Sequence, residues 1–316
     1  MKRIEISAII LTVLLMGCST VKYSLKESYT RLNSDNYCIL STKEFGNIQY
    51  KDINTNGIPI LIIHGITGGY DQGLITGKGV LPDNRRTISI SRFGYLKSDM
   101  PADSSPKNQC MAFKYLLDTL KIDKVVLLAA SAGGTIALKF ALMYPDRVSG
   151  IILIGSGYPD TKKPKGPLGP PSFIYNDNLF EYMLNNMQGT MLGMFGISSN
   201  EYKNGSQNDK QGVDELFNSI LPINPKKRGI LNDENITNPD MIINYKDYPI
   251  EDIRAPVLIL HAKNDPMAKY DTMIEASKRF SNVIIKEYEL GGHILYGHNE
   301  ETKESVENFL QKIEKE

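Results

Sequence analysis

The sequence has few of the residues on which several common classes of protein depend. Its 316 residues include only three cysteines and four histidines. The cysteines, at positions 18, 38 and 110, are too few and too widely spaced for a disulfide scaffold or a paired-cysteine zinc site. The sequence also lacks an HExxH, EF-hand, GxxxxGK[ST] or dinucleotide-binding pattern. We therefore expect neither a bound metal nor a cofactor.

An excess of charge of one sign is also absent. Lys and Arg total 36 and Asp and Glu total 36, so the formal net charge is zero. Nucleic acid binding requires a basic face that can neutralise phosphates, so we expect no nucleic-acid partner. A composition of 41% hydrophobic and 23% charged residues is ordinary for a soluble globular protein, and it excludes wholesale disorder and a polytopic membrane protein.

The first residues have the pattern of an export signal. Lys2 and Arg3 precede a short apolar run at residues 9–16, and Gly17 and Cys18 follow it. The run is shorter than the roughly 20 residues that span a bilayer. The pattern predicts a secretory signal, and a buried N-terminal helix is the alternative.

Residues 15–18, Leu-Met-Gly-Cys, resemble the bacterial lipobox, with the bulky Met16 where a small residue is commoner. The resemblance implies that residues 1–17 are removed and that Cys18 carries lipid, which would make the protein an extracytoplasmic, membrane-anchored lipoprotein. A plain signal with an incidental cysteine is the other interpretation. Residues 18–36 are polar and lack a clear apolar period, so they predict a tether.

From residue 37 onward, short apolar strands alternate with helical segments. A hairpin is expected around Gly46, and the later strands are expected at residues 59–64, 87–90, 125–128, 151–154, 257–260 and 283–285. Helices are expected between them at residues 105–120, 135–144, 271–280 and 302–313. Strands separated by helices predict an α/β fold with a mostly parallel, doubly wound sheet, built from residues 37–157 and 249–316.

Residues 158–248 interrupt this alternation. The interval starts with several prolines, has no strand pattern, and carries apolar side chains at helical spacing. These are Leu179, Phe180, Met183, Leu184, Met187, Met191 and Met194. We predict a helical cap over the carboxyl edge of the sheet, where ligands bind in such folds. The apolar stripe either packs the cap or lines a pocket for an apolar chain. Packing is favoured, because apolar side chains at helical spacing more often belong to a core.

Residues 127–135, Leu-Leu-Ala-Ala-Ser-Ala-Gly-Gly-Thr, place Ser131 between a buried strand and a helix. Very small neighbours let strand and helix approach closely, so that the serine stands exposed on a tight turn. The amide of Ala132 would then face a developing oxyanion from a helix N-terminus. The stretch resembles the nucleophile elbow of α/β-hydrolases, Gly-x-Ser-x-Gly, with Ala129 in place of the first glycine. A serine helix cap is the alternative.

Two earlier loops also resemble that family. The strand expected at residues 59–64 runs into residues 64–69, His-Gly-Ile-Thr-Gly-Gly, which are similar to the family's HG oxyanion loop. The resemblance implies that the backbone N–H of Ile66 is the second oxyanion donor and that His64 holds the loop. Residues 91–99 are similar to the family's loop after the next strand, with structural or pocket-forming roles.

The acid and the base should follow later strands, in the order serine, acid, histidine. Asp265 lies in the turn after a buried strand, and His293 follows the final strand. His298 is the rival base and Asp160 the rival acid. The resemblance thus covers about residues 37–314 and implies an α/β-hydrolase fold with Ser131, Asp265 and His293 as the catalytic triad.

The resemblance implies a serine hydrolase that cleaves a small carboxylic ester through an acyl-enzyme intermediate. The same triad also serves aminopeptidases, thioesterases, acyltransferases and C–C-bond hydrolases, and a non-catalytic binding or sensor lipoprotein is a further alternative. A peptidase would need an acidic site for the substrate amine; the cap carboxylates Glu181, Asp214 and Glu215 have no role that the sequence assigns. Cys38 and Cys110 could pair, but two small core residues are the simpler interpretation.

Overall fold

The computed structural model describes residues 22–53, 57–83, 85–162 and 169–315. The predicted signal peptide and Cys18 lie outside these residues. Within the described ranges, no helix combines the length and the apolar character needed to cross a membrane.

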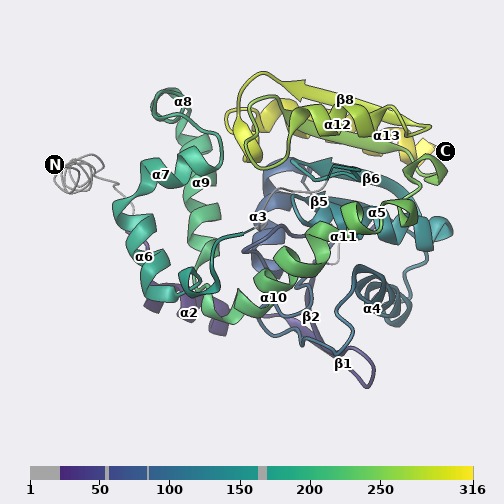
Figure 1. Ribbon diagram of the computed structural model, residues 1–316, viewed down its shortest axis with the longest axis horizontal. Coiled ribbons are helices and arrows are strands. Elements are labelled where there is room, and N and C mark those ends of the chain that lie inside the picture. The colour runs from purple at the N-terminus through teal and green to yellow at the C-terminus, as the bar shows by residue number, and fades with distance from the viewer. Residues whose placement is uncertain (1–21, 54–56, 84, 163–168, 316) are drawn as a thin grey trace.

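One eight-stranded sheet forms the centre of the molecule, in the order β1-β2-β4-β3-β5-β6-β7-β8 (Figure 1). β1 and β2 are antiparallel, β2 pairs antiparallel with β4, and all later pairs are parallel. The bounds are β1 Cys38–Thr42, β2 Gly46–Ile53, β3 Ile60–Ile63, β4 Thr87–Ile90, β5 Val125–Ala130, β6 Val148–Ile154, β7 Val257–Ala262 and β8 Val283–Tyr288. The predicted α/β fold with a mostly parallel, doubly wound sheet is confirmed.

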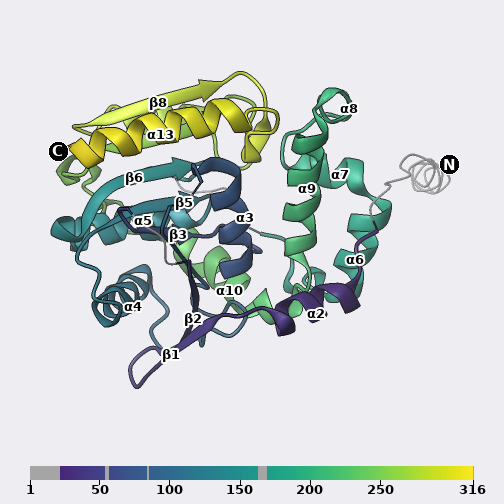
Figure 2. The same cartoon turned by 180° about the vertical axis from the view of Figure 1, so that it is seen from behind.

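Successive residues of the central strands enter two separate apolar cores. Leu61 and Ile63 of β3 pack on the side of α4, α5 and α12, whereas Ile60 and Ile62 pack on the side of α13. Strands that are covered on both faces require the continuous apolar runs seen in the sequence. Figure 2 shows α3 and α13 in front of the sheet. The helix bounds are α3 Tyr70–Val80, α4 Pro106–Thr119, α5 Gly133–Met143, α12 Tyr270–Ser277 and α13 Asn299–Lys315.

The segment between β6 and β7 is helical, and its first four helices stand beside the sheet (Figures 1 and 2). Its α-helices and one π-helical turn are α6 Asp177–Asn186, α7 Gln188–Met194, α8 Ser199–Asn204, α9 Gln207–Ile220, α10 Lys227–Asn232, the π-helical turn Asp233–Thr237 and α11 Asn238–Ile243. Phe180, Leu184 and Met191 of the apolar stripe are buried in the cap's own core, whereas Met194 is exposed. The stripe therefore mainly packs the cap.

The predicted tether is wrong for its second half. Leu25–Ser34 is a helix, α2, with Ser24 as its N-cap. Tyr23 is buried in the cap core, and its hydroxyl donates to Asp214 at 2.8 Å. Arg31 donates to Asp71 of α3 at 2.6 Å and to the Leu221 carbonyl of the cap at 3.0 Å. The contacts of α2 with the rest of the protein are mostly hydrogen bonds from polar side chains. Its sequence therefore looks the same as that of a solvated segment.

The two described cysteines are free. Cys110 is buried in the core, as expected of a small core residue, but Cys38 is exposed on β1.

Candidate active site

Ser131 occupies a sharp turn between β5 and α5. Its backbone is left-handed, with φ of 51°, a conformation that costs energy for any residue except glycine. The Ser131 amide donates to the Ile154 carbonyl at the end of β6 at 2.9 Å. Gly133 lies so close to β3 that an added Cβ would come 2.4 Å from the Ile63 carbonyl oxygen. The small residues around Ser131 therefore allow the tight turn that the sequence predicts.

Asp265 and His293 form a hydrogen-bonded pair. Asp265 lies in the turn after β7, and His293 lies in the 3₁₀ turn Gly292–Ile294 after β8. His293 Nδ1 is 2.8 Å from Asp265 Oδ2, while Asp265 Oδ1 accepts hydrogen bonds from the backbone N–H groups of Met267 and Ala268 at 2.8 and 3.0 Å.

The electrostatics of this pair favour an ionised carboxylate. Burial by itself raises the pKa of Asp265, but the hydrogen bonds from His293 and from two backbone amides outweigh it and hold the pKa below the ordinary 3.8. A carboxylate at Nδ1 accepts the Nδ1–H of His293 and thereby leaves the Nε2 lone pair available as a base.

The carboxyl end of β6 brings the serine turn close to this pair. Ile154 accepts the hydrogen bond from Ser131, and the next residue, Gly155, borders both partners of the pair. A Cβ added to Gly155 would lie 3.1 Å from His293 Nδ1 and 3.3 Å from Asp265 Oδ2. Among the described residues, Ser131 Oγ has no hydrogen bond to His293, a contact that often tightens only when substrate binds.

The two amides expected to bind an oxyanion belong to residues close to Ser131. Ala132 follows it at the N-terminus of α5, and Ile66 follows Gly65, whose added Cβ would be 3.0 Å from Ser131 Cβ. Neither the Ile66 nor the Ala132 amide donates a hydrogen bond to any group in the described part of the chain. Both amides are therefore available to a ligand held at Ser131.

His64 is buried beneath this loop. Its Nδ1 lies 2.7 Å from the Gly65 carbonyl oxygen, and its Nε2 accepts a hydrogen bond from the Arg92 amide at 3.1 Å. Burial and the nearby Arg92 charge hold the pKa of His64 well below its usual range. A neutral imidazole with both nitrogens occupied holds the loop, as expected from the sequence.

The rival residues take no part in the pair. The His298 ring lies tilted against Tyr288, with ring centroids 4.4 Å apart, and its Nδ1 lies 3.8 Å from a Glu301 oxygen. Asp160 accepts a hydrogen bond from the Lys162 amide at 2.9 Å, at the start of the cap.

Asn264 and Phe195 are site residues that the sequence reasoning missed. The Asn264 side chain accepts from the Gly292 amide at 2.9 Å and donates to the Gly196 carbonyl of the cap at 3.0 Å. The Phe195 carbonyl accepts a hydrogen bond from the His293 amide at 2.7 Å. The loop between α7 and α8 is thus fixed to the turns that carry Asp265 and His293. Only the position of Asn264, next to Asp265, could have drawn attention to it.

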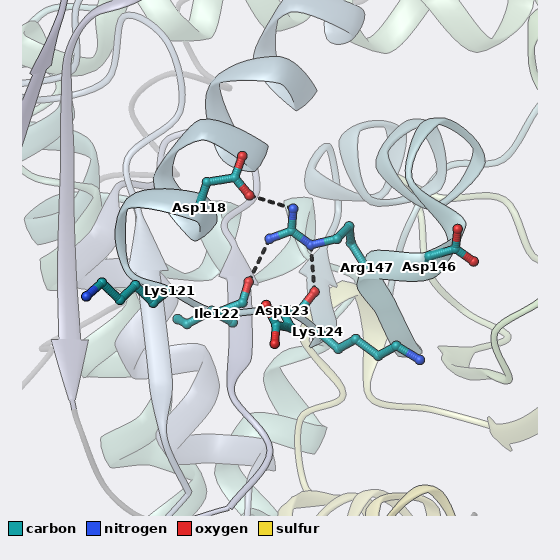
Figure 3. Close-up of a pocket in the computed structure, with 7 residues that line it drawn as sticks. All are labelled: Asp118, Lys121, Ile122, Asp123, Lys124, Asp146 and Arg147. Carbon is teal, nitrogen blue, oxygen red and sulfur yellow. Dashed lines mark hydrogen bonds and ion pairs between the residues drawn. The ribbon is translucent and has the colours of Figure 1, made fainter.

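A polar hollow lies at the amino ends of β5 and β6, whereas Ser131 follows the carboxyl end of β5 (Figure 3). Its Arg147 guanidinium is fully engaged by Asp118 and by the carbonyl groups of Ile122 and Asp123, each at 2.6 Å. Arg147 therefore joins the end of α4 and the segment before β5 to the start of β6. Among the described residues, no group of three or more His, Cys, Asp or Glu side chains is placed to hold a metal ion.

Comparison with known proteins identifies the family. A sequence model of the alpha/beta hydrolase fold matches residues 58–299. A 2-hydroxy-6-oxononadienedioate/2-hydroxy-6-oxononatrienedioate hydrolase from Pseudomonas putida is 24% identical, over 78% of this chain and 85% of its own. The chain belongs to the alpha/beta hydrolase fold family.

Solved structures agree with this assignment. An alpha/beta hydrolase fold protein from Nakamurella multipartita superposes with a TM-score of 0.70 at 18% identity, covering 87% of this chain and 98% of that one. An esterase from Exiguobacterium antarcticum gives a TM-score of 0.62 at 22% identity, covering 86% and 98%. These likenesses show the fold, and with the family match and the hydrolase relatives they support an enzyme of the serine hydrolase type.

Proposed function

We propose that this protein is a serine hydrolase that cleaves small carboxylic esters, with Ser131, His293 and Asp265 as its catalytic triad. The observation that carries the proposal is the arrangement around the end of β6. A serine with a left-handed backbone lies on one side of it, and a histidine–carboxylate pair borders Gly155 on the other.

The proposed mechanism follows from the chemistry of these groups. Ser131 Oγ attacks the ester carbonyl carbon while His293 Nε2 accepts its proton, and Asp265 stabilises the resulting imidazolium. The Ile66 and Ala132 amides donate to the oxyanion of the tetrahedral intermediate, and one such donor contributes about 3–4 kcal/mol. His293 then protonates the leaving alkoxide as the carbonyl reforms, which gives an alcohol and the acyl-enzyme. Water, deprotonated by His293, attacks the acyl group in the same way and releases the acid.

The surroundings of the site favour an apolar acyl or aryl group. Ile66 of the oxyanion loop, Phe195 of the cap and Ile294 beside His293 all pack against the apolar core of the cap. The interface between core and cap at the site is therefore lined with hydrocarbon, which suits the uncharged part of an ester.

The structure gives no support for the aminopeptidase alternative. Each of the three cap carboxylates singled out in the sequence has a partner elsewhere in the protein. Glu181 accepts from the Leu25 amide, Asp214 accepts from the Tyr23 hydroxyl, and Glu215 pairs with Lys78. None of them is left free for a substrate amine.

A second candidate is C–C-bond hydrolysis of a hydroxy-oxo-dienoate. It is favoured by curated relatives named as hydrolases of such compounds, one from Pseudomonas putida and one from Dechloromonas aromatica, the latter 23% identical over 83% of this chain. Loss of the conjugated dienol absorbance on addition of enzyme would detect this activity.

The first test is hydrolysis of p-nitrophenyl esters with short and medium acyl chains. We expect turnover by the wild-type protein, reaction with a fluorophosphonate, and loss of both in Ser131→Ala. In Asp265→Asn the serine is intact but the imidazole loses its orienting carboxylate, so kcat should fall by about 10³–10⁴. Absence of both ester turnover and fluorophosphonate labelling in the wild type would contradict the proposal and favour a binding protein.

We also propose that the chain is exported and carries lipid on Cys18, which would place the enzyme at a membrane surface. The support is the lipobox-like sequence at residues 15–18. Expression with a labelled fatty acid should give a labelled protein, and Cys18→Ser should abolish the label. A labelled Cys18→Ser variant would contradict the anchor.

A further inference from the structure

The peptide group between Gly65 and Ile66 is held on its carbonyl side by two donors. His64 Nδ1 lies 2.7 Å from the Gly65 carbonyl oxygen, and Arg92 Nη2 donates to the same oxygen at 3.1 Å. In a trans peptide, the C=O and N–H bonds lie in one plane and point in opposite directions. Two hydrogen bonds to the Gly65 oxygen therefore also fix the direction of the Ile66 N–H.

Arg92 is itself fixed by the cap. Its two terminal nitrogens donate to the two carboxylate oxygens of Asp233, each at 2.5 Å, and the side chains are 2% and 1% exposed. Tyr95 donates its hydroxyl to Asp233, and its ring lies 5.0 Å from the Arg92 guanidinium carbon. Planar, two-pronged pairing of this kind fixes the orientation of a guanidinium as well as its position.

Arg92 also acts on the same carbonyl through His64. The Arg92 amide donates to His64 Nε2 at 3.1 Å, so the single proton of the neutral ring lies on Nδ1, where it meets the Gly65 oxygen. Residue 92 therefore acts on both donors to this oxygen, on His64 through its backbone amide and directly through its guanidinium. Its charge further polarises the peptide group, which makes the Ile66 N–H a stronger donor in a water-poor environment.

The ion pair is poorly explained as an attachment for the cap alone. A buried ion pair adds little net stability compared with apolar packing of similar volume. Asp233 begins the π-helical turn Asp233–Thr237 of the cap, and such irregular turns occur frequently at functional sites. Arg92, the partner of Asp233, contacts the peptide group that carries the Ile66 amide.

We propose that Arg92 is a positioning residue for the oxyanion hole and that Asp233 makes this role depend on the seated cap. The proposal rests on the proposed serine hydrolase activity. With the cap in place, Asp233 orients Arg92, Arg92 and His64 hold the Gly65 carbonyl, and the Ile66 N–H faces the oxyanion. Movement of the cap away from the core would release Arg92 and weaken the hole.

The test compares three variants of the full-length protein: Arg92→Lys, Asp233→Asn and Glu234→Gln. Lysine keeps the charge but cannot reach both partners, and asparagine presents one acceptor oxygen in place of two. Glu234→Gln is the matched control, because Glu234 neighbours Asp233 on the same turn but bonds to Tyr175 within the cap. A fluorophosphonate titration counts competent sites, so that kcat refers to folded enzyme only.

We expect kcat per titrated site to fall about 10- to 100-fold in Arg92→Lys and Asp233→Asn, with KM changed less than about threefold. Inhibition by an aryl trifluoromethyl ketone, whose serine adduct carries an oxyanion, should weaken by the same factor as kcat. In Glu234→Gln both values should stay within about twofold of the wild type. If one of the two test variants does not fold, the kcat and the inhibition of the other variant decide the outcome.

Wild-type-like kcat and inhibition in the folded test variants would overturn the proposal, as would an equal loss in Glu234→Gln. If neither variant gives folded protein, the ion pair is needed for folding, and the proposal is also overturned. A wild-type protein that does not react with the fluorophosphonate would instead contradict the underlying hydrolase function.

Discussion

Gly155 and His293 lie so close together that a methyl group on Gly155 would come 2.7 Å from the His293 carbonyl oxygen. The same methyl group would come 3.1 Å from His293 Nδ1, the atom that bonds to Asp265. Gly155 follows the last residue of β6, which also accepts the hydrogen bond from the Ser131 amide. One strand end thus holds the serine turn and leaves room for the histidine–carboxylate pair.

The backbone of Ser131 should carry a measurable energetic cost. With φ of 51°, any side chain is strained at this position, whereas glycine is not. We expect the free energy of unfolding of Ser131→Gly to exceed that of Ser131→Ala by about 1 kcal/mol, although both lack the proposed nucleophile. Urea denaturation of the two variants measures the difference. A less stable glycine variant would contradict the strained turn.

Gly133 and Gly79 should respond oppositely to substitution by alanine. A Cβ on Gly133 would come 2.4 Å from the Ile63 carbonyl oxygen, which belongs to a central strand and cannot move away easily. An added Cβ on Gly79, near the end of α3, meets nothing within 4 Å.

We therefore expect Gly133→Ala to lower the free energy of unfolding by about 2 kcal/mol or more and to slow the reaction of Ser131 with a fluorophosphonate. Gly79→Ala should raise stability by up to about 1 kcal/mol, because alanine favours helix over glycine. Thermal denaturation and labelling rates give both values. Normal labelling of a stable Gly133→Ala protein would show that the elbow tolerates a larger residue.

Arg31 should be important for stability because it joins α2 both to α3 beside the sheet and to the cap. Its guanidinium donates to Asp71 of α3 and to the Leu221 carbonyl of the cap. We expect Arg31→Ala to lower the free energy of unfolding by about 1–3 kcal/mol, the usual cost of leaving such partners unsatisfied. Lys26→Ala, an exposed change on the same helix, is the control and should stay within about 0.5 kcal/mol. Equal stabilities would mean that α2 contributes no more than a tether.

Acid should destabilise the protein in part through Asp265. Because its pKa in the folded protein lies below the ordinary 3.8, its ionised form stabilises the fold above that pH. This contribution is lost as the pH falls from 3.8 through the lower folded value. The free energy of unfolding should therefore decline less steeply with acidification in Asp265→Asn than in the wild type. Parallel curves from urea denaturation between about pH 3 and 6 would contradict the assignment.

Much of the fold could be predicted because its signals are local. Buried parallel strands need continuous apolar runs, so β3 to β7 are visible as short stretches of sequence. The tight turn at Ser131 needs very small neighbours, and these stand next to it in the chain. The α/β class, the position of the cap and the elbow serine therefore follow from spacing and composition.

The structure of α2 and the ion pair between Arg92 and the cap could not be predicted in this way. Arg92 and Asp233 are 141 residues apart, and Tyr23 and Asp214 are 191 apart. A charged or polar side chain carries no local sign of which distant group it will meet, since solvent exposure would explain its identity equally well. α2 therefore resembles a solvated tether, although its side chains bond to the cap and to α3.

The sequence by itself determined the order of strands and helices, the sharp turn at Ser131 and a short set of candidate acids and bases. The tertiary structure alone decided that Asp265 and His293 meet and that Asp160 and His298 lie apart from them. It also decided that Asp233 of the cap pairs with Arg92, which bonds to the Gly65 carbonyl. The physical reason is that backbone periodicity is imposed by near neighbours, whereas the pairing of buried polar groups is set by the packing of elements distant in the chain.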